Sequence, residues 1–250
     1  MMPSPAGRPT ASVSFLNNAS PSQTRVVEMC ASPLFAGLTP AECLHIASYA
    51  RMHTFARDEV IFLQGQPVQS LILILAGCVK LTQVSSSGNE VILWMKGNRE
   101  PIGVHGDPGG SRGVYTCSAR AMERCTTLLW DRLRVHKLLD AYPRIGANIS
   151  QILSDQLEEL EERFREIATE RVARRLALAL LRLTKRVGKP HQAGTQVSLS
   201  REELAQLIGT NLFTTSRILS KWNEAGVVLA RREAVVIRDV ERLQIHAESI

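Results

Sequence analysis

The segment at residues 201–222, REELAQLIGTNLFTTSRILSKW, constrains the fold more than any other stretch of this chain. Ser200 and Glu203 have the spacing of a capping box, which predicts that a helix begins between them. Gly209 then permits the positive φ angle that a sharp chain reversal needs. A small residue at the fifth position of the segment, glycine at the ninth and an apolar residue at the eighteenth predict a helix-turn-helix over residues 201–220. An ordinary helical hairpin is the alternative.

The second helix of this motif exposes its N-terminal half, the part of a recognition helix that meets the edges of DNA bases. We therefore expect base reading by Leu212, Phe213, Ser216 and Arg217. An arginine can donate two hydrogen bonds to guanine O6 and N7, so Arg217 is expected to read a guanine. Contacts to phosphate position a protein without reading sequence. They are expected from Arg201, Thr210, Asn211, Thr214, Lys221, Arg231 and Arg232.

Positive charge is concentrated in the same part of the chain. Residues 169–250 hold 14 Lys or Arg and 8 Asp or Glu, whereas residues 1–168 hold 16 of each, so the whole excess of +6 lies in the last third. A basic segment of this kind favours a polyanionic partner such as double-stranded DNA. A merely solvated basic surface is the alternative.

A long helix with one apolar seam is predicted over residues 144–168. Within NISQILSDQLEELEERFREIATE, apolar residues recur at spacings of 4, 3, 4 and 3, which is a heptad pattern. The residues of this seam are Leu153, Leu157, Leu160, Phe164 and Ile167. A single helix with a narrow seam usually needs a partner, so we expect two copies of the chain to pack side by side as a two-fold homodimer. The alternative is a helix that lies on its own β-domain.

The segment before this helix has a different period. Residues 53–132 contain short runs rich in Val, Ile, Leu and Thr, separated by turn sequences such as QGQP, SSSGN and GDPGG. This pattern is typical of an antiparallel barrel or jelly roll, so the fold class predicted for the whole chain is α+β. The expected parts are a disordered leader (1–24), a jelly-roll sensor domain (25–143), a dimerisation helix (144–168) and a winged helix-turn-helix domain (169–250).

Local sequence adds detail to the last of these parts. Residues 188–195, GKPHQAGT, are interpreted as a loop. Residues 226–240 are predicted to form a two-stranded ribbon, or wing, that turns at Arg231-Arg232-Glu233. A short closing helix is expected after the wing.

Several classes of protein are disfavoured by what the sequence lacks. The N-terminal segment has no continuous apolar core of a secretory signal, and no run of about 18 apolar residues occurs, so we expect a cytoplasmic protein without a membrane span. The five cysteines are odd in number and widely spread, which argues against a disulfide framework or an iron–sulfur cluster. The six histidines are isolated, so we expect neither a metal site nor an enzyme. A metal-dependent enzyme on a cupin-type roll is the alternative.

From about residue 28 to residue 245 the chain resembles the Crp/Fnr family of transcription regulators. The matching pieces are PLFAGLTPAE, DEVIFLQGQPVQSLILILAGCVKLTQVSSSGNEVIL, the heptad helix, and SREELAQLIGTNLFTTSRILSKW with its wing. The resemblance implies a cyclic-nucleotide-binding-type β-roll, a dimerising helix and a winged helix-turn-helix. It also implies a homodimer on a palindromic operator with half-sites ~34 Å apart, and RNA polymerase as a further partner.

The effector pocket of that family corresponds here to Gly103, Val104, His105, Tyr115 and Thr116. In members that bind cyclic AMP, a Gly-Glu-Leu segment followed by Arg-Ser/Thr-Ala cradles the ribose and the phosphate. Val104 stands where the Glu is expected and cannot accept a hydrogen bond from a 2′-hydroxyl. Tyr115 stands where the Arg is expected and carries no positive charge for a phosphodiester. We therefore expect that cyclic AMP is not the effector.

Haem is a second effector class that the resemblance raises. The carbon-monoxide sensors of the family bind haem through a His in the equivalent segment, and His105 sits close to that position. Because an imidazole can ligate haem iron, a haem-based gas or redox sensor that uses His105 is an alternative. A ligand-binding β-roll protein without DNA binding is another. The leading expectation is a DNA-binding regulator with no identified cofactor.

The recognition helix departs from the family pattern at Phe213, which replaces a common Glu, whereas Ser216-Arg217 is retained. A phenylalanine cannot accept a hydrogen bond from cytosine N4, but it can pack on the methyl group of thymine. We expect a guanine read by Arg217 in each half-site. The base preference should differ from the family's at the base pair that the Glu would read.

Overall fold

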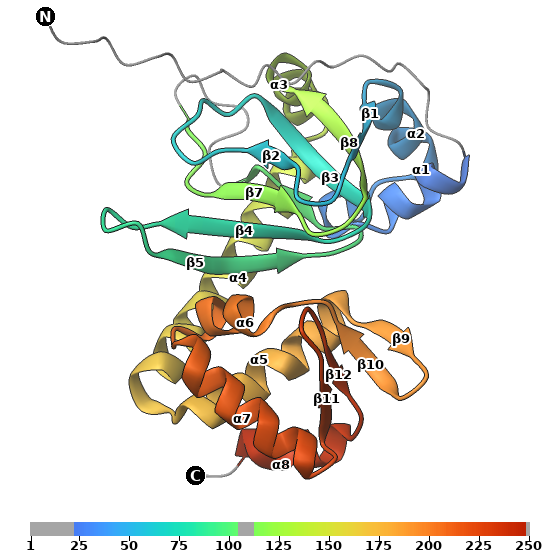
Figure 1. Ribbon diagram of the computed structural model, residues 1–250. Helices are drawn as coiled ribbons and strands as arrows, with labels where there is room; N and C mark the ends of the chain where they lie inside the picture. Colours follow the sequence, from blue (N-terminus) through green and yellow to red (C-terminus); the bar gives the residue numbers. More distant parts are fainter. Residues whose placement is uncertain (1–22, 105–112, 249–250) are drawn as a thin grey trace, which may run out of the picture.

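The computed structural model describes residues 23–104 and 113–248 of the 250-residue chain (Figure 1). Residues 1–22 of the predicted leader and His105 lie outside these described residues. Helix α1 (Gln23–Cys30) begins one residue before the predicted end of the leader at residue 24. None of the described helices is long and apolar enough to cross a membrane.

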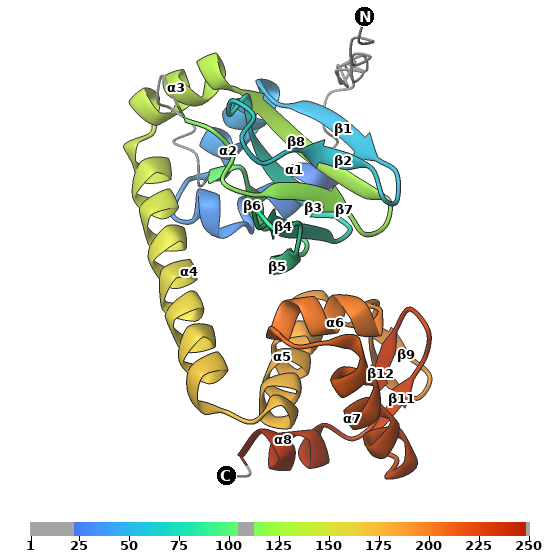
Figure 2. The ribbon, with the colours of Figure 1, turned by 60° about the vertical axis from the view of Figure 1, so that its left-hand side comes forward.

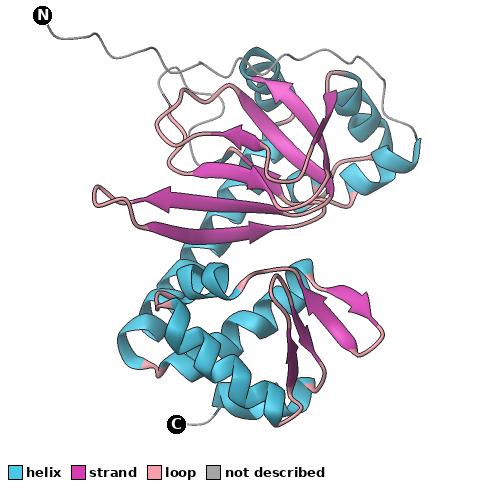
Figure 3. Ribbon diagram, in the orientation of Figure 1, coloured by secondary structure: helices cyan, strands magenta, loops and turns pink. Residues whose placement is uncertain are grey.

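Two four-stranded antiparallel sheets form the N-terminal domain within the described residues (Figure 3). The strand order is β1-β8-β3-β6 in one sheet and β2-β7-β4-β5 in the other. This arrangement confirms the predicted jelly roll and the α+β fold class. The strands are β1 (Arg51–Phe55), β2 (Val60–Phe62), β3 (Ser70–Ala76), β4 (Val79–Val84), β5 (Glu90–Lys96), β6 (Pro101–Ile102), β7 (Ser118–Ala121) and β8 (Cys125–Asp131).

Strand β3 shows why the run SLILILA lacks polar alternation. Leu71, Leu73 and Leu75 belong to a core shared with the helices of this domain. Ile72 and Ile74, which alternate with them, belong to the core between the two sheets. Successive side chains of a strand point to opposite faces, so a strand covered on both faces is apolar throughout.

Helices cover the outer face of the β1-β8-β3-β6 sheet. Thr39 and Glu42 form a complete capping box at the start of one of them, which begins at Pro40. The fully buried Trp130 links sheet and helix, because its indole Nε1 donates a hydrogen bond to the carbonyl oxygen of Ile46 at 3.0 Å. The covering elements are α1, η1 (Pro33–Phe35), α2 (Pro40–Ser48) and α3 (Arg132–Ala141).

Helix α4 (Pro143–Thr169) leads from the roll to the C-terminal domain (Figure 2). That domain has a four-stranded sheet in the order β11-β12-β10-β9, packed with four helices among the described residues. Its elements are α5 (Val172–Val187), β9 (Lys189–His191), β10 (Gly194–Val197), α6 (Arg201–Ile208), α7 (Leu212–Glu224), β11 (Val228–Ala230), β12 (Val235–Ile237) and α8 (Val240–Glu248). The wing and the closing helix lie where the sequence predicts them.

The interpretation of residues 188–195 as a loop is wrong. Lys189–His191 pairs antiparallel with Gly194–Val197 as a β-hairpin. Strand β10 pairs on its other side with β12 of the wing, so β9 becomes the edge strand of the sheet. An edge strand with mostly exposed polar residues carries no apolar alternation from which it could be recognised.

The two domains share one apolar core. Leu176, Leu180 and Leu204 of the C-terminal domain pack in the same cluster as Ile92 and Met95 of strand β5. The helix-turn-helix is therefore seated against the sheet of the roll in this structure.

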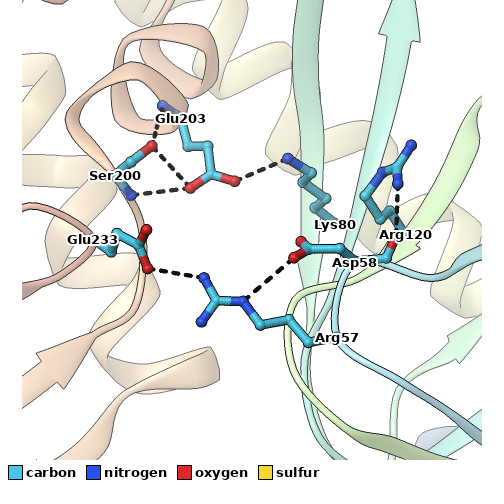
Figure 4. Close-up of polar contacts among 7 residues, drawn as sticks. All are labelled: Arg57, Asp58, Lys80, Arg120, Ser200, Glu203 and Glu233. Carbon is cyan, nitrogen blue, oxygen red and sulfur yellow. Dashed lines mark hydrogen bonds and ion pairs between the residues drawn. The ribbon is translucent and has the colours of Figure 1, made fainter.

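Ion pairs accompany the apolar contact between the domains (Figure 4). Lys80 of β4 binds Glu203 of α6 with an Nζ–Oε1 distance of 2.9 Å, and both side chains are largely buried. Arg57, just before β2, binds Glu233 at the tip of the wing with an Nη2–Oε2 distance of 3.0 Å, in an exposed position. Both the start of the helix-turn-helix and the wing are thus held by the roll.

Candidate nucleic-acid interface

Helix α6 begins and ends as the sequence predicts. The Ser200 hydroxyl accepts a hydrogen bond from the Glu203 backbone N–H at 3.2 Å, and the Glu203 carboxylate accepts one from the Ser200 N–H at 3.0 Å. Gly209 ends the helix at φ +65°, in the left-handed region that favours glycine. Its backbone N–H donates to the carbonyl oxygen of Ala205. These residues place the turn between the two helices.

Helix α7 is capped by Asn211, whose side-chain oxygen accepts a hydrogen bond from the Thr214 N–H at 2.8 Å. Its inner face carries Thr215, Leu219 and Trp222, all buried. With both ends of α6 fixed and the inner face of α7 buried, the outer face of α7 is held rigidly toward solvent.

The residues predicted to read bases lie on that outer face. Phe213 is 85% exposed, and Leu212 beside it is 42% exposed. Arg217 is exposed one turn further along the helix, and Ser216 is half-buried. An apolar pair next to a free guanidinium on a capped helix is suited to a thymine methyl group and a neighbouring guanine.

The predicted phosphate contacts occupy four places. Thr210, Asn211 and Thr214 gather at the N-terminus of α7, where the helix dipole favours an anion. Lys221 is exposed on the last turn of α7, and Arg201 is half-buried at the start of α6.

The wing forms the fourth place. Arg231 and Arg232 are exposed at its tip and line a cleft between the C-terminal domain and the roll, together with Arg57 and Lys80.

The predicted dimer seam divides into two parts. Leu157, Phe164 and Ile167 are exposed, by 57%, 74% and 48%. Leu153 and Leu160 instead pack partly against the cores of their own roll. One edge of α4 therefore lies on its own domain, as the alternative interpretation expects, and the other edge is uncovered in the single chain.

The interior of the roll is filled at the predicted effector position. The ring of Tyr115 stacks on Phe62 with centroids 3.9 Å apart and an interplanar angle of 10°. Its hydroxyl accepts hydrogen bonds from the N–H groups of Gln69 and Ser70, at 3.2 and 3.3 Å, and donates to the Ser70 carbonyl oxygen at 3.3 Å. Burial raises the pKa of this phenol above its ordinary value, so it stays neutral.

The other predicted pocket residues that the structure describes supply no charge to this interior. Val104 is buried, Thr116 is exposed, and Gly103 has φ +83°. A Cβ on Gly103 would come within 2.8 Å of the Ser70 carbonyl oxygen. The described residues of this pocket therefore supply no cation to a cyclic phosphodiester, which needs a cation or free backbone N–H groups.

Glu203 connects the capping box to the ion pair with the roll. Burial alone would raise its pKa, but the hydrogen bonds from Lys80 and Ser200 outweigh burial and hold the pKa below its ordinary value. A carboxyl group whose pKa is lowered on folding stabilises the protein at pH above its unfolded pKa. This contribution is lost as the pH falls through the lowered folded-state pKa.

We expect Glu203→Ala to destabilise the protein by about 1 kcal/mol at neutral pH, the typical loss for a helix cap. Urea unfolding at several pH values measures the difference. The difference between the variant and the wild type should shrink in acid, because protonated Glu203 no longer makes these contacts. Glu202→Ala, an exposed neighbour on the same turn, is the control with little expected loss. A Glu203→Ala loss that does not change with pH would contradict this account.

Known proteins share both domains. Residues 174–245 match the family model of the Crp-like helix-turn-helix domain, and residues 52–142 match that of the cyclic nucleotide-binding domain. The cyclic AMP receptor protein of Thermus thermophilus is 30% identical over 216 residues, which cover 86% of this chain and 97% of that protein. The CRP-like cAMP-activated global transcriptional regulator of Mycobacterium tuberculosis is 26% identical over 214 residues, covering 84% and 94%.

A solved structure extends the likeness to the fold. The c-di-GMP-responsive global regulator CLP of Xanthomonas campestris has a TM-score of 0.69 and 23% identity, over 80% of this chain and 99% of that chain. Roll, connecting helix and winged helix-turn-helix together define a transcription regulator with a DNA-binding domain. The chain belongs to the Crp/Fnr family of such regulators.

Proposed function

We propose that this regulator acts as a homodimer that binds a palindromic operator through helix α7 and does so without cyclic AMP. The observation that carries the proposal is the outer face of α7, where Arg217 and Phe213 are free on a helix capped at its start and buried along its inner face. RNA polymerase at the promoter is the further partner expected from family membership, and the cytoplasm is the expected compartment.

Recognition would combine two kinds of contact. Arg217 would donate to guanine O6 and N7, while Leu212 and Phe213 would pack on thymine methyl groups and Ser216 would bond a base edge or a phosphate. Phosphates would be bound at the N-terminus of α7 and by the basic side chains of α6, α7 and the wing. The excess of positive charge in this domain supports the assignment.

Dimerisation would occur along the uncovered edge of α4. Leu157, Phe164 and Ile167 are large apolar side chains left exposed on a helix of 27 residues. A second copy packed on this edge would bury the same residues of both chains, as a two-fold contact requires. The two α7 helices would then meet successive major-groove segments about 34 Å apart.

Selection of binding sites from a random duplex pool tests the proposal. The selected sites should share an inverted repeat with one guanine in each half-site. Binding in a gel-shift assay should also weaken steeply as salt rises, because phosphate contacts release counterions. A pool that yields no shared sequence, or a protein that ignores duplex DNA at low salt, would contradict it.

We further expect no cyclic AMP binding, because Tyr115 stands where the resemblance places the phosphate-binding Arg, and its ring is packed on Phe62 inside the roll. Isothermal titration with cyclic AMP should show no saturable heat, and operator affinity should be the same with and without the nucleotide. The cyclic AMP receptor protein of Thermus thermophilus is the positive control in the same buffer. Saturable binding, or a nucleotide-dependent rise in operator affinity, would refute this part of the proposal.

A further inference from the structure

Four elements of the two domains meet beside Trp94 of strand β5. Helix α4 passes the sheet of the roll here, and helices α5 and α6 of the C-terminal domain approach from the other side (Figure 2). We call this place the junction. Its side chains are Trp94, Glu159, Arg163, Glu166, Arg182 and Arg186.

Arg163 touches all three parts of the molecule that the junction connects. It extends from α4, and its guanidinium donates hydrogen bonds to the carbonyl oxygens of Leu93 and, at 3.3 Å, Ile92 in strand β5. The same group donates to the carbonyl oxygen of Leu207 in the last turn of α6 at 3.0 Å. The last carbonyls of a helix lack partners within it and attract a cation. One side chain thus joins the dimerisation helix to the roll and to the helix-turn-helix.

The two carboxylates of the junction pair with other arginines and not with Arg163. Glu166 binds Arg182 of α5 through two hydrogen bonds, at 2.6 and 2.9 Å. Glu159 binds Arg186 of α5 likewise, at 3.1 and 2.9 Å. No carboxylate of the described residues forms an ion pair with Arg163 itself, which lies 5.7 Å from the centre of the Trp94 ring. Its planar fork is fixed by carbonyls instead.

A second arginine supports the same end of α6. Arg175 donates to the carbonyl oxygen of Ile167 at 3.1 Å and to that of Gly209 at 3.4 Å. It therefore ties the turn of the helix-turn-helix to the end of α4. Unlike Arg175, Arg163 also donates hydrogen bonds to the sheet of the roll.

We propose that Arg163 is a positioning residue, which fixes the helix-turn-helix on the dimerisation helix and so sets the separation of the two recognition helices in the dimer. This inference rests on the proposed function. The two copies of α4 form the centre of that dimer, so the angle of α6 and α7 relative to α4 decides how far apart the α7 helices lie. A loosened angle lowers affinity for the one half-site spacing that fits and reduces discrimination against other spacings.

The test compares Arg163→Met with the wild type on a set of duplexes. These carry the half-site selected from the random pool, as a single copy and as inverted repeats with the natural spacing or with two base pairs inserted or removed. Arg163→Met should reduce the preference for the natural spacing by about tenfold, a readily measured change in binding constant. Affinity for the single half-site and the dimeric mass should stay as in the wild type, which a merely structural loss would not allow.

Two variants separate geometry from charge and from folding. Arg165→Met removes the same charge from the exposed face of α4, where Arg165 pairs only with Glu162 among the described residues, and it should keep the wild-type spacing preference. Arg163→Lys keeps the charge but not the fork, so it should lose part of the preference. This variant carries the test if melting shows that Arg163→Met is unfolded.

The possible outcomes distinguish failure of the positioning role from failure of the proposed dimeric recognition. An unchanged spacing preference in both Arg163 variants, equal weakening on the single half-site, or the same loss in Arg165→Met would overturn the positioning role. A wild type that binds no duplex, or binds all spacings equally, would instead reject the proposed dimeric recognition.

Discussion

Arg217→Ala should reduce affinity for the selected operator by about a hundredfold and remove the preference for guanine at one position of each half-site. A two-bond arginine–guanine contact contributes about 1–3 kcal/mol of discrimination, and the proposed dimer loses two such contacts at once. The side chain is exposed on α7, so its removal should leave the melting temperature unchanged. Fluorescence anisotropy on the operator, and on duplexes with each guanine replaced, measures both effects.

Lys221→Ala is the matched control for Arg217, because it removes one exposed cation from the same helix. A phosphate contact carries no sequence information, so this variant should weaken binding equally on all duplexes and lower the salt dependence by about one unit per lost contact. An Arg217→Ala protein that still selects the same guanine would disprove its assignment as a base reader. That result would mean that other residues of α7 read the base sequence.

Local signals in the sequence were sufficient to predict the helix-turn-helix. Each boundary is decided by neighbouring residues: the Ser200–Glu203 box begins α6, and the left-handed Gly209 ends it. The lack of polar alternation in β3 likewise reports only that both of its faces are covered. Such features depend on a few consecutive residues, so they can be recognised in the sequence without knowledge of the tertiary structure.

The heptad pattern of α4 could be predicted from the sequence, but the surface that each of its residues contacts could not. Its residues form two columns, with Leu153, Leu160 and Ile167 seven residues apart in one, and Leu157 and Phe164 in the other. The first column lies along the roll at Leu153 and Leu160, whereas Ile167 lies near Gly209 of the helix-turn-helix and is 48% exposed. Sequence spacing cannot say which column meets which surface, since both repeat every seven residues.

The junction and the packed interior of the roll are formed by contacts between residues that are far apart in the sequence. Arg163 and Leu207 are 44 residues apart, and Tyr115 and Ser70 are 45 apart. The sequence indicated that Tyr115 could not bind phosphate, yet only the fold places its ring on Phe62. Arg163 carried no signal, because a charged residue outside an apolar seam is ordinarily solvated.

Phe164→Glu should convert the dimer into a monomer. Phe164 is 74% exposed in the single chain, so the change removes little packing within one subunit, but across the proposed two-fold axis it buries a carboxylate without a partner. Loss of the second half-site should reduce palindrome affinity by about 10²–10⁴-fold, the usual gain from linking two binding events. Sedimentation equilibrium and gel shift on palindromic and single half-sites measure the two effects.

Leu133→Glu on helix α3 provides the matched control for Phe164→Glu. Leu133 is 78% exposed, as apolar as Phe164 and far from the seam in sequence, so its replacement should leave both the mass and the operator affinity unchanged. The chemistry of the substitution is then the same, and only the position differs. A Phe164→Glu protein that stays dimeric and binds the palindrome like the wild type would show that the uncovered edge of α4 is not the dimer contact. The spacing of the half-sites would then have to be set by another surface.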